Sequence, residues 1–483
     1  MKIRLIEPES PGTHVWAKVR IPRLGLPMIA AALEAQGHDV LIYSPQLAPI
    51  DWDDVDSSEL VGLSTTTSTA GAAYEFADRL RAKGIPVVIG GSHVTFMADE
   101  ALEHTDYVAR GEGGEQLMGE LIEALGSSGK LDSIAGLSFR RDGQVVHNPL
   151  RARCADLDSL PIPDLELLVG HEQITNVPIM TSWGCPFACT FCSVTAMFGH
   201  KYRFRSAENV VAEIKAKRPK IIFFCDDNFA ADAKRLKCLL HLMVAEDLVI
   251  PWSAQVRTDV VRDPELLELM QRSGCGIVYL GLESVNQKTL DAFHKSQSVA
   301  DIERAIRALH DHGIKSHGMF VLGADTDDAQ TVRKTVSFAI RNHIDTVMLS
   351  ILTPLPGTPQ FEQLDAAGRI FDKRWQLYDA HHVVFEPKLM SPYELQMEVL
   401  RGCMRFYSLR AWLRSIFALQ FTRQLLWHWW GMMIIRSWRR DAHNKAFVAA
   451  LKCTSSRTTS GDATSPGIEE RQRRGATANV HYP

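Results

Sequence analysis

The sequence predicts an α/β fold: a doubly wound parallel sheet, then a partial barrel of six βα units, then a mostly helical region. Two observations support this. Short apolar runs alternate with helix-like segments at the start of the chain and again from residue 176. A hydrophobic content of 46% over 483 residues suffices for two or three domains. The expected units are 1–125, a linker at 126–175, the barrel at 176–355, a helical domain at 356–453 and a disordered tail at 454–483.

The region 1–125 alternates strands and helices in chain order. This rhythm gives a parallel sheet, because each crossover returns the chain to the same edge. Five strands are predicted at 2–7, 39–43, 60–64, 86–90 and 107–110, with helices at 26–36, 70–83, 96–104 and 115–125.

Small polar residues and glycines follow three of these strands. Ligands of such sheets bind at the carboxyl ends of the strands, where glycine allows close approach and hydroxyl groups offer hydrogen bonds. A sheet of this kind that binds nothing is the alternative. The candidate ligand-binding residues are Ser64, Thr65, Thr66, Gly90, Gly91, His93, Gly111, Glu112 and Gly113.

The linker and the barrel follow. Residues 126–130 read Gly-Ser-Ser-Gly-Lys, a flexible break, and 136–147 is typical of a short hairpin. Six βα units with right-handed crossovers then make a partial barrel, whose chemistry lies at the carboxyl ends of the strands. The strands are expected at 177–182, 220–225, 251–256, 277–281, 315–322 and 346–352, with helices at 207–217, 232–246, 264–273, 299–312 and 328–342.

Three cysteines, Cys185, Cys189 and Cys192, follow the first barrel strand with the spacing C-x3-C-x2-C. Thiolates suit iron–sulfur clusters or zinc. A four-iron cluster held by three cysteines keeps one iron open for a small ligand, whereas structural zinc needs a fourth ligand. His200 is the candidate fourth ligand for zinc, and simple burial of the cysteines is a further alternative.

The cysteine loop, with Phe191 before the third cysteine, resembles the signature of the radical S-adenosylmethionine enzymes. The Gly-Gly-x-His and Gly-Glu-Gly turns ahead of it resemble the cobalamin-dependent members, over roughly residues 1–400. The resemblance implies a [4Fe-4S] cluster, S-adenosylmethionine, and cobalamin in a flavodoxin-like first domain. The D-x-H-x-x-G motif is absent: His14 lies in the corresponding loop without it. We therefore expect His93 near the corrin as a polar residue and not as a cobalt ligand.

The resemblance also assigns cofactor contacts to the ends of the barrel strands. Carboxylates after the second strand would hold the methionine ammonium, a carboxylate after the fourth would accept from the ribose, and a glycine after the fifth would let adenosine stack on backbone. Helix capping is the alternative for the acidic residues, and an ion pair or a substrate contact for the arginine. The residues concerned are Asp226, Asp227, Gln255, Arg257, Glu283, Ser284 and Gly323.

The function implied is methyl transfer from methylcobalamin to an unactivated carbon of a small, hydrophobic substrate by way of a 5′-deoxyadenosyl radical. Such a carbon has no acidic proton, so cofactors must carry the reaction. A flavodoxin or ferredoxin would supply the electron. The alternatives are a radical cyclase or oxidative enzyme, with non-methylating or absent cobalamin, and a zinc-stabilised interaction protein at a membrane surface. Substrate identity does not follow from the sequence.

Residues 403–440 hold seven arginines, five of the ten tryptophans and no acidic residue. Arg423 near the middle of the apolar run costs about 2.5–3.5 kcal/mol in a membrane, which disfavours a span. An amphipathic helix at a lipid surface is predicted, with a lipid-like substrate; a helix packed on the barrel is the alternative.

The net charge of −4 predicts no nucleic-acid binding. Nine cysteines without a disulfide pattern, and no signal segment, predict a cytoplasmic protein, peripheral at the inner membrane face.

Overall fold

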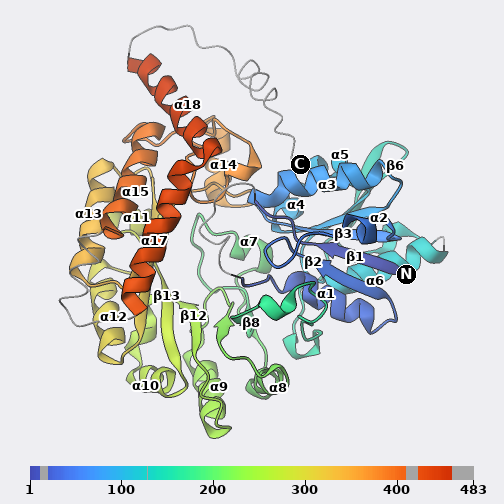
Figure 1. Ribbon diagram of the computed structural model, residues 1–483, viewed down its shortest axis with the longest axis horizontal. Helices are drawn as coiled ribbons and strands as arrows, with labels where there is room; N and C mark the ends of the chain where they lie inside the picture. The colour runs from blue at the N-terminus through green and yellow to red at the C-terminus, as the bar shows by residue number, and fades with distance from the viewer. Residues whose placement is uncertain (11–19, 128, 409–422, 460–483) are drawn as a thin grey trace.

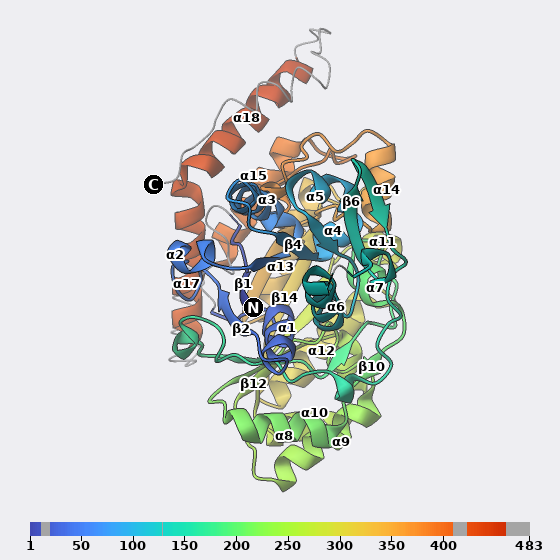
Figure 2. The same cartoon turned by 90° about the vertical axis from the view of Figure 1, so that its right-hand side faces the viewer.

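The computed structural model describes residues 1–10, 20–127, 129–408 and 423–459. Two lobes lie side by side, a sheet lobe from the N-terminal part of the chain and a barrel lobe from its middle (Figure 1). The C-terminal helices lie against the barrel lobe, and α18 projects away from it (Figure 2).

The first sheet has seven strands in the order β2-β1-β3-β4-β5-β6-β7. Its first five strands are parallel, which confirms the predicted doubly wound sheet. The predicted hairpin pairs antiparallel to β5 and extends this sheet. The strands are β1 (Lys2–Ile6), β2 (Asp39–Tyr43), β3 (Leu60–Thr65), β4 (Val87–Gly91), β5 (Tyr107–Ala109), β6 (Leu137–Arg141) and β7 (Gln144–His147).

Helices cover both faces of this sheet. Apolar residues of α1 and α6 pack on one face, and those of α3 and α5 pack on the other. The single helix predicted at 96–104 is two helices that meet at Met97. The helix α2, which is capped by Asp51, was not predicted. The helices are α1 (Gly25–Glu34), α2 (Trp52–Asp56), α3 (Ala70–Arg81), α4 (Ser92–Phe96), α5 (Ala98–His104) and α6 (Gly114–Ser127).

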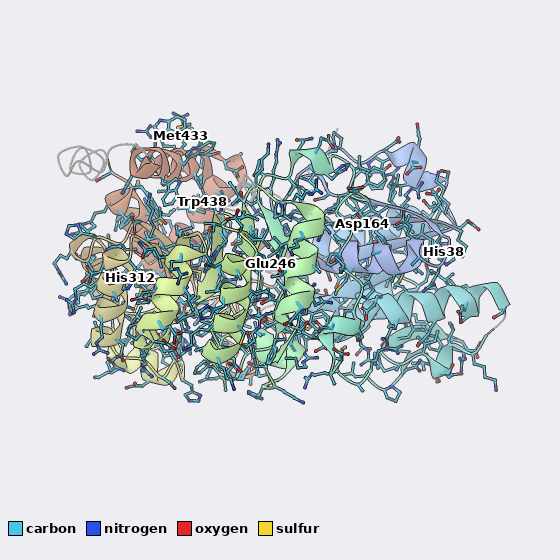
Figure 3. The ribbon with its side chains drawn as sticks, turned by 90° about the horizontal axis from the view of Figure 1, so that it is seen from below. His38, Asp164, Glu246, His312, Met433 and Trp438 are labelled. Carbon is cyan, nitrogen blue, oxygen red and sulfur yellow. The ribbon has the colours of Figure 1, made fainter. Side chains whose placement is uncertain are left out.

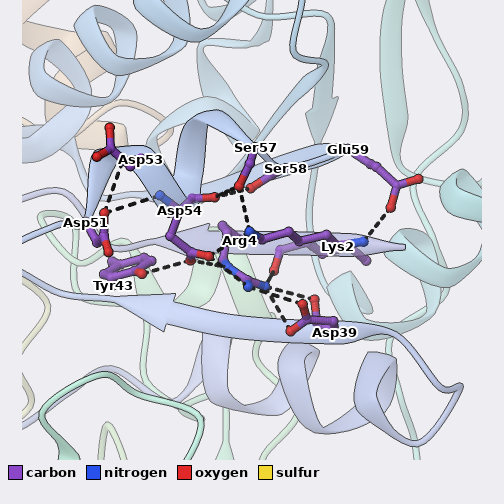
Figure 4. A network of polar contacts seen from close by, with 11 residues as sticks. Lys2, Arg4, Asp39, Tyr43, Asp51, Asp53, Asp54, Ser57, Ser58 and Glu59 are labelled. Atoms are coloured by element: carbon purple, nitrogen blue, oxygen red, sulfur yellow. Dashed lines mark hydrogen bonds and ion pairs between the residues drawn. The ribbon is translucent and has the colours of Figure 1, made fainter.

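A buried arginine fastens β1 to its neighbours (Figure 4). The Arg4 side chain is only 4% exposed; it donates to Asp39 at 3.2 Å and to Asp54 at 3.1 Å. Tyr43 donates to the same Asp54 carboxylate at 2.8 Å. The Arg4 guanidinium holds the pKa of Asp54 well below its usual range. This network ties β1, β2 and α2 together.

The second sheet has six parallel strands in the order β15-β14-β13-β12-β11-β8, as expected of a partial barrel. Helices alternate with the strands and bury a single large core. The strands are β8 (Val177–Ile179), β11 (Ile222–Phe224), β12 (Trp252–Val256), β13 (Cys275–Glu283), β14 (Lys315–Leu322) and β15 (Thr346–Ile351). The helices are α8 (Ala207–Lys217), α9 (Ala233–Ala245), α10 (Pro264–Arg272), α11 (Gln287–Ala292), α12 (Val299–Asp311) and α13 (Ala329–Arg341).

The C-terminal region is mostly helical and packs on the barrel and also, through residues such as Trp375 and Phe447, on the first lobe. It contains α14 (Pro359–Ala366), the 3-10 helix η7 (Trp375–Leu377), α15 (Pro392–Phe406), α17 (Arg423–Arg440) and α18 (Ala442–Thr459). The Tyr407 hydroxyl donates to the Val347 carbonyl at 2.7 Å at the edge of β15. Buried His382 bonds Asp379 through Nδ1 at 2.9 Å and Asn444 of α18 through Nε2 at 2.9 Å. Helix α18 extends into the tail predicted at 454–483 and ends at Thr459, so the prediction of disorder was wrong there; residues 460–483 lie outside the described residues.

Candidate cofactor site at the carboxyl edges of the two sheets

The cysteine loop begins where a small hairpin ends. Strand β9 (Ser182–Trp183) pairs antiparallel with β10 (Arg203–Phe204). Gly184 follows with a φ of +84°, and a β-carbon there would lie 2.7 Å from the Lys201 carbonyl oxygen. Only glycine fits this turn. The turn sends the chain directly into Cys185.

The three thiols are half-buried and lie close enough to influence one another. Burial raises the pKa of Cys192 to about 12, with Cys189, Asp227 and Cys185 adding to it. Burial also raises the pKa of Cys185. Protonated thiols do not ligate metal, so iron would have to displace these protons on binding.

Three cysteine thiols in one loop are a donor set that suits an iron–sulfur cluster. Across the described residues, no group of three or more His, Cys, Asp or Glu side chains is arranged to hold one metal ion. A four-iron cluster binds each thiolate through a different iron, so its ligands need not converge on a point. His200, the alternative zinc ligand, is exposed. The cysteine loop therefore fits the predicted cluster.

Aromatic residues brace the loop. Phe191 packs edge-on against Phe293, with ring centroids 4.9 Å apart. The guanidinium of Arg257 lies 3.6 Å above the ring of Phe187, a cation–π contact. Arg257 also donates to the Lys295 carbonyl, while its buried Nε has no partner in the described structure. An anionic group of a cofactor would satisfy that nitrogen.

Two adjacent carboxylates at the end of β11 have different surroundings. Buried Asp226 accepts from the backbone N–H groups of Thr181 and Ser182 at 2.7 and 2.8 Å, and from the Thr181 hydroxyl. Asp227 makes no hydrogen bond within the described part of the chain, and its side chain reaches solvent. Partial burial and the neighbouring Asp226 raise the pKa of Asp227 to about 7. Asp226 thus holds the strand that leads into the cysteine loop, and Asp227 is available to a ligand.

The predicted ribose ligand, Glu283, is ion-paired. Lys295 Nζ lies 2.5 Å from its carboxylate, and both side chains are 8% exposed. Glu283 has a φ of +59°, at a register shift in β13. A non-glycine residue in this conformation is strained. The strain points the carboxylate at the lysine, so a ribose would have to share it with Lys295.

The remaining barrel candidates have structural partners of their own. Gln255 is half-buried on β12. Ser284 is fully buried, and its hydroxyl accepts from the Asn286 N–H at 3.0 Å. Gly323 has a φ of +102°, and a β-carbon there would lie 2.5 Å from a methyl group of Leu395 on α15. Gly323 therefore allows the C-terminal helix to pack against the end of β14.

The loops after β3 and β4 form the candidate cobalamin edge. The Thr65 hydroxyl donates to the Gly90 carbonyl at 2.9 Å, and Thr66 caps the turn that follows. A β-carbon on Gly91 would lie 2.2 Å from the Thr65 carbonyl oxygen. Ser64 and Thr66 are half-buried, which leaves part of this edge accessible. The residue His14 lies outside the described residues.

His93 turns into the protein. Its ring lies 4.9 Å from that of Trp375 and 6.2 Å from that of Tyr74. Its Nε2 is 3.8 Å from Glu100, and neither ring nitrogen has a hydrogen-bond partner in the described structure. Its partners lie in α3, α5 and η7, so the contact with a corrin remains a prediction.

The Gly111–Gly113 loop contacts other parts of the chain. Buried Glu112 accepts two hydrogen bonds from Arg203 of β10. A β-carbon on Gly113 would lie 2.5 Å from the Arg151 side chain, and one on Gly111 would lie 3.6 Å from Leu150. The end of β5 is thus covered by the linker and by the β9–β10 hairpin.

Three contacts join the first lobe to the barrel lobe and the C-terminal region. The first is the Glu112–Arg203 pair. In the second, Gly357 of the loop after β15 packs on the Phe96 ring of α4. In the third, Trp375 Nε1 donates to Glu100 at 2.6 Å. Figure 1 shows α4 and α7 (Val194–Phe198) on the sides of the lobes that face each other. The two carboxyl edges therefore face one shared region.

Sequence reasoning missed the residues that join these edges. Arg203 and Phe187 carry no motif that marks them. Their partners are distant in the chain, and nothing local marks them. The nearest to a signal is the place of Phe187 two residues after Cys185, because an aromatic side chain inside a ligand loop needs something to stack on.

The fold and the cysteine loop define an iron–sulfur barrel enzyme with an added cofactor-binding sheet. A family model described as the radical SAM superfamily matches residues 179–339. A second model, described as a B12 binding domain, matches residues 16–119. Together these two models cover most of the barrel and most of the first sheet.

Related proteins agree. The bacteriochlorophyllide d C-12(1)-methyltransferase of Chlorobaculum tepidum is 30% identical over 393 residues, which are 78% of this chain and 82% of that protein. The anaerobic magnesium-protoporphyrin IX monomethyl ester cyclase of Rubrivivax gelatinosus is 30% identical over 352 residues, 69% of this chain and 62% of that protein. The solved structure of TsrM from Kitasatospora setae, with cobalamin and a [4Fe-4S] cluster bound, is 19% identical with a TM-score of 0.63, covering 76% and 75% of the two chains.

This chain belongs to the cobalamin-dependent radical S-adenosylmethionine enzymes. Its cofactors are a [4Fe-4S] cluster, S-adenosylmethionine and cobalamin.

Proposed function

We propose that the protein is a methyltransferase that adds a methyl group to an unactivated carbon of a bulky, mostly apolar small molecule. The observation that carries the proposal is that the cysteine loop and the cobalamin-type loops lie on carboxyl edges that contact each other. When bound, the cofactors supply reductive cleavage of S-adenosylmethionine, hydrogen abstraction and the methyl donor. The methyltransferase relative of Chlorobaculum tepidum supports this reading.

The inner face of the barrel supports an apolar substrate. Alternate residues of its strands are half-buried on the side away from the helices. The rings of Phe223 and Tyr279 lie 5.8 Å apart, and those of Tyr279 and His317 lie 4.9 Å apart. Met319 and Met348 extend the same wall. Aromatic and thioether groups with one imidazole favour a flat, largely apolar molecule.

The side chains of the site would bind and orient the cofactors and the substrate. The Asp227 carboxylate would accept from the methionine ammonium, and Arg257 would face a carboxylate. Gln255 would offer an amide to the substrate or cofactor. Cys185, Cys189 and Cys192 would hold the cluster. Asp226 keeps the cysteine loop in place through its bonds to Thr181 and Ser182.

A cyclase or another oxidation is the second candidate, favoured by the Rubrivivax gelatinosus relative. Incubation with S-adenosylmethionine carrying a trideuterated methyl group separates the two. Methyl transfer leaves the label in the product, whereas cyclisation yields an unlabelled product that has lost hydrogen. A tetrapyrrole and a polycyclic lipid are the substrates to try first, and an unlabelled product from both would reject the methyltransferase proposal.

The first experiment tests the cofactors. Anaerobically purified protein, expressed with cobalamin, should hold roughly four irons per chain and about one cobalt. Cys189→Ala should remove the cluster and abolish 5′-deoxyadenosine formation. Cys238→Ala, at an exposed cysteine on α9, is the matched control and should retain both. Formation of 5′-deoxyadenosine by Cys189→Ala would rule out the cluster assignment. An external flavodoxin or ferredoxin should replace a chemical reductant in this assay.

We also propose a cytoplasmic protein that touches the inner membrane face through residues 403–440. Of that range, 409–422, including Trp412, lie outside the described residues. Among the described helices, none is both long enough and apolar enough to cross a bilayer. Trp429, Trp430 and Met433 of α17 are 48%, 45% and 36% exposed. Met433 lies on the outer side of the helix and Trp438 on the inner side (Figure 3).

Exposed arginines lie on the same helix, at 436, 439 and 440. Tryptophan and arginine together favour the surface of an anionic bilayer. Co-sedimentation with phosphatidylglycerol vesicles should be lost in the double variant Trp429→Ser, Trp430→Ser. Val249→Ser, at a 54% exposed apolar residue before β12, is the control. Equal sedimentation of all three proteins, or no sedimentation of the wild type, would reject membrane contact.

A further inference from the structure

The ion pair between Glu112 and Arg203 is the most buried polar contact between the two lobes. Arg203 Nη1 and Nη2 lie 2.7 and 2.6 Å from the two Glu112 oxygens. The side chains are 3% and 4% exposed. A bidentate pair has one geometry, since the planar guanidinium must lie in the plane of the carboxylate. The pair therefore fixes orientation as well as distance.

Each partner belongs to one cofactor loop. Glu112 lies between two glycines with φ values of +78° and +83°, at the end of β5 in the candidate cobalamin edge. Arg203 lies directly opposite Trp183, two residues before Cys185. The pair thus connects the loop after β5 to the hairpin strand that leads into the cysteine loop.

Arg203 also contacts the chain on the other side of the cysteine loop. Its Nη2 donates to the Phe198 carbonyl, at the end of α7, at 3.1 Å, and its Nη1 donates to the Cys154 carbonyl of the linker at 2.7 Å. Helix α7 starts two residues after Cys192. One guanidinium therefore contacts the entrance of the cysteine loop, its exit, the linker and the first sheet.

We propose that Glu112 and Arg203 are positioning residues that set the cobalamin-binding edge against the cluster loop and so couple cleavage of S-adenosylmethionine to transfer to substrate. The inference rests on the proposed function. Under this proposal Glu112 does not contact a cofactor directly, because Arg203 bonds both of its carboxylate oxygens. Misplacement of reacting groups by about 1 Å can cost 100-fold in rate, so loss of this anchor should lower coupling in addition to its cost in stability.

A buried pair of the same kind inside the barrel lobe gives a matched control. Arg205 and Glu213 lie 2.5 Å apart with side chains 4% and 0% exposed, and Arg205 is two residues from Arg203. Glu213→Gln should lower stability without changing the relation between the lobes. Glu112→Gln removes the charge at nearly constant volume, and Arg203→Lys keeps a charge but loses the bidentate geometry.

The first test needs no cofactor. Hydrogen–deuterium exchange of the unloaded chain should rise at least about fivefold in the β9–β10 hairpin for Glu112→Gln and Arg203→Lys, because the anchor of the hairpin is lost. Glu213→Gln should leave the 111–113 loop unchanged. Unchanged exchange in the hairpin for both variants would overturn the proposal. If Glu112→Gln does not fold, the exchange rate of the hairpin in Arg203→Lys alone tests the proposal.

The second test uses protein loaded with iron, cobalamin and S-adenosylmethionine. Pulsed electron paramagnetic resonance should give one narrow cobalt-to-cluster distance in the wild type and a broadened one in the variants. The ratio of 5′-deoxyadenosine to methylated product should rise about tenfold or more, with metal contents equal to those of the wild type. Selective loss of cobalt with unchanged hairpin exchange would make Glu112 a direct cofactor ligand and overturn the proposal. Absence of cobalt from the wild type would instead refute the proposed function.

Discussion

Asp226 and Asp227 are adjacent in the chain, yet their replacement by alanine should have different consequences. Asp226 accepts from two backbone N–H groups and a hydroxyl at the strand that enters the cysteine loop. Asp227 makes no hydrogen bond within the described residues and is exposed, and we propose that it binds S-adenosylmethionine. Asp226→Ala should therefore destabilise the fold, and Asp227→Ala should weaken cofactor binding.

The magnitude for Asp226 follows from the groups left unpaired. Alanine leaves the N–H groups of Thr181 and Ser182 buried without acceptors, and each costs about 1–3 kcal/mol. The total loss is about 2–6 kcal/mol in the free energy of unfolding. Asp226→Asn keeps one acceptor oxygen for both N–H groups, so it should cost less than alanine. Asp227→Ala removes one charge-assisted bond to S-adenosylmethionine, worth about 1.5–3 kcal/mol or roughly 10- to 100-fold in affinity.

Two measurements separate the roles. Thermal melting of the unloaded protein should fall for Asp226→Ala, less for Asp226→Asn, and not for Asp227→Ala. Iron retained after anaerobic reconstitution should follow the same order, because the cysteine loop loses its support. Equilibrium binding of S-adenosylmethionine to the iron-loaded protein should be weakened in Asp227→Ala. Equal melting of Asp226→Ala and Asp227→Ala would refute the reasoning.

Three further predictions concern stability. Gly323→Ala should lower the free energy of unfolding by about 2 kcal/mol or more, since both its positive φ and contact with Leu395 oppose a β-carbon. Gly368→Ala, at φ +63° with nothing within 4 Å, should lower it by only about 1 kcal/mol, and chemical denaturation compares the two. The pKa of Asp379 is lowered to about 2 despite its burial, chiefly by His382. Asp379→Asn should therefore lower the free energy of unfolding by about 2 kcal/mol above pH 4, and this difference should vanish as the pH falls towards 2. A constant difference across that range would contradict the assignment. Arg4→Leu should cost about 3–5 kcal/mol because Asp54 loses its buried partner, and a melting temperature equal to that of the wild type would show that the network adds nothing.

Chain-local patterns predicted much of the fold and part of the site. The predicted limits are correct for the strands at 39–43 and 315–322 and for the helix at 207–217. The apolar runs of parallel strands and the amphipathic pattern of helices can both be recognised from neighbouring residues. The break at Met97 was missed, since it depends on how α4 turns over the end of β4. The β9–β10 hairpin was also missed, because its two-residue strands carry too little pattern.

The sequence by itself determined the cysteine spacing, the order of strands and helices, and the glycines that sharp turns require. These follow from interactions between residues close in the chain. Only the tertiary structure decided the partner of each charged group: Asp226 bonds Thr181 and Ser182, Glu283 pairs with Lys295, and Glu112 pairs with Arg203. Each such pair joins separately folded elements. The energy of a charge depends on its desolvation and on its distance from other charges, and not on residue type alone. The packing of those elements therefore decides which carboxylate pairs with a cation and which stays accessible to a cofactor.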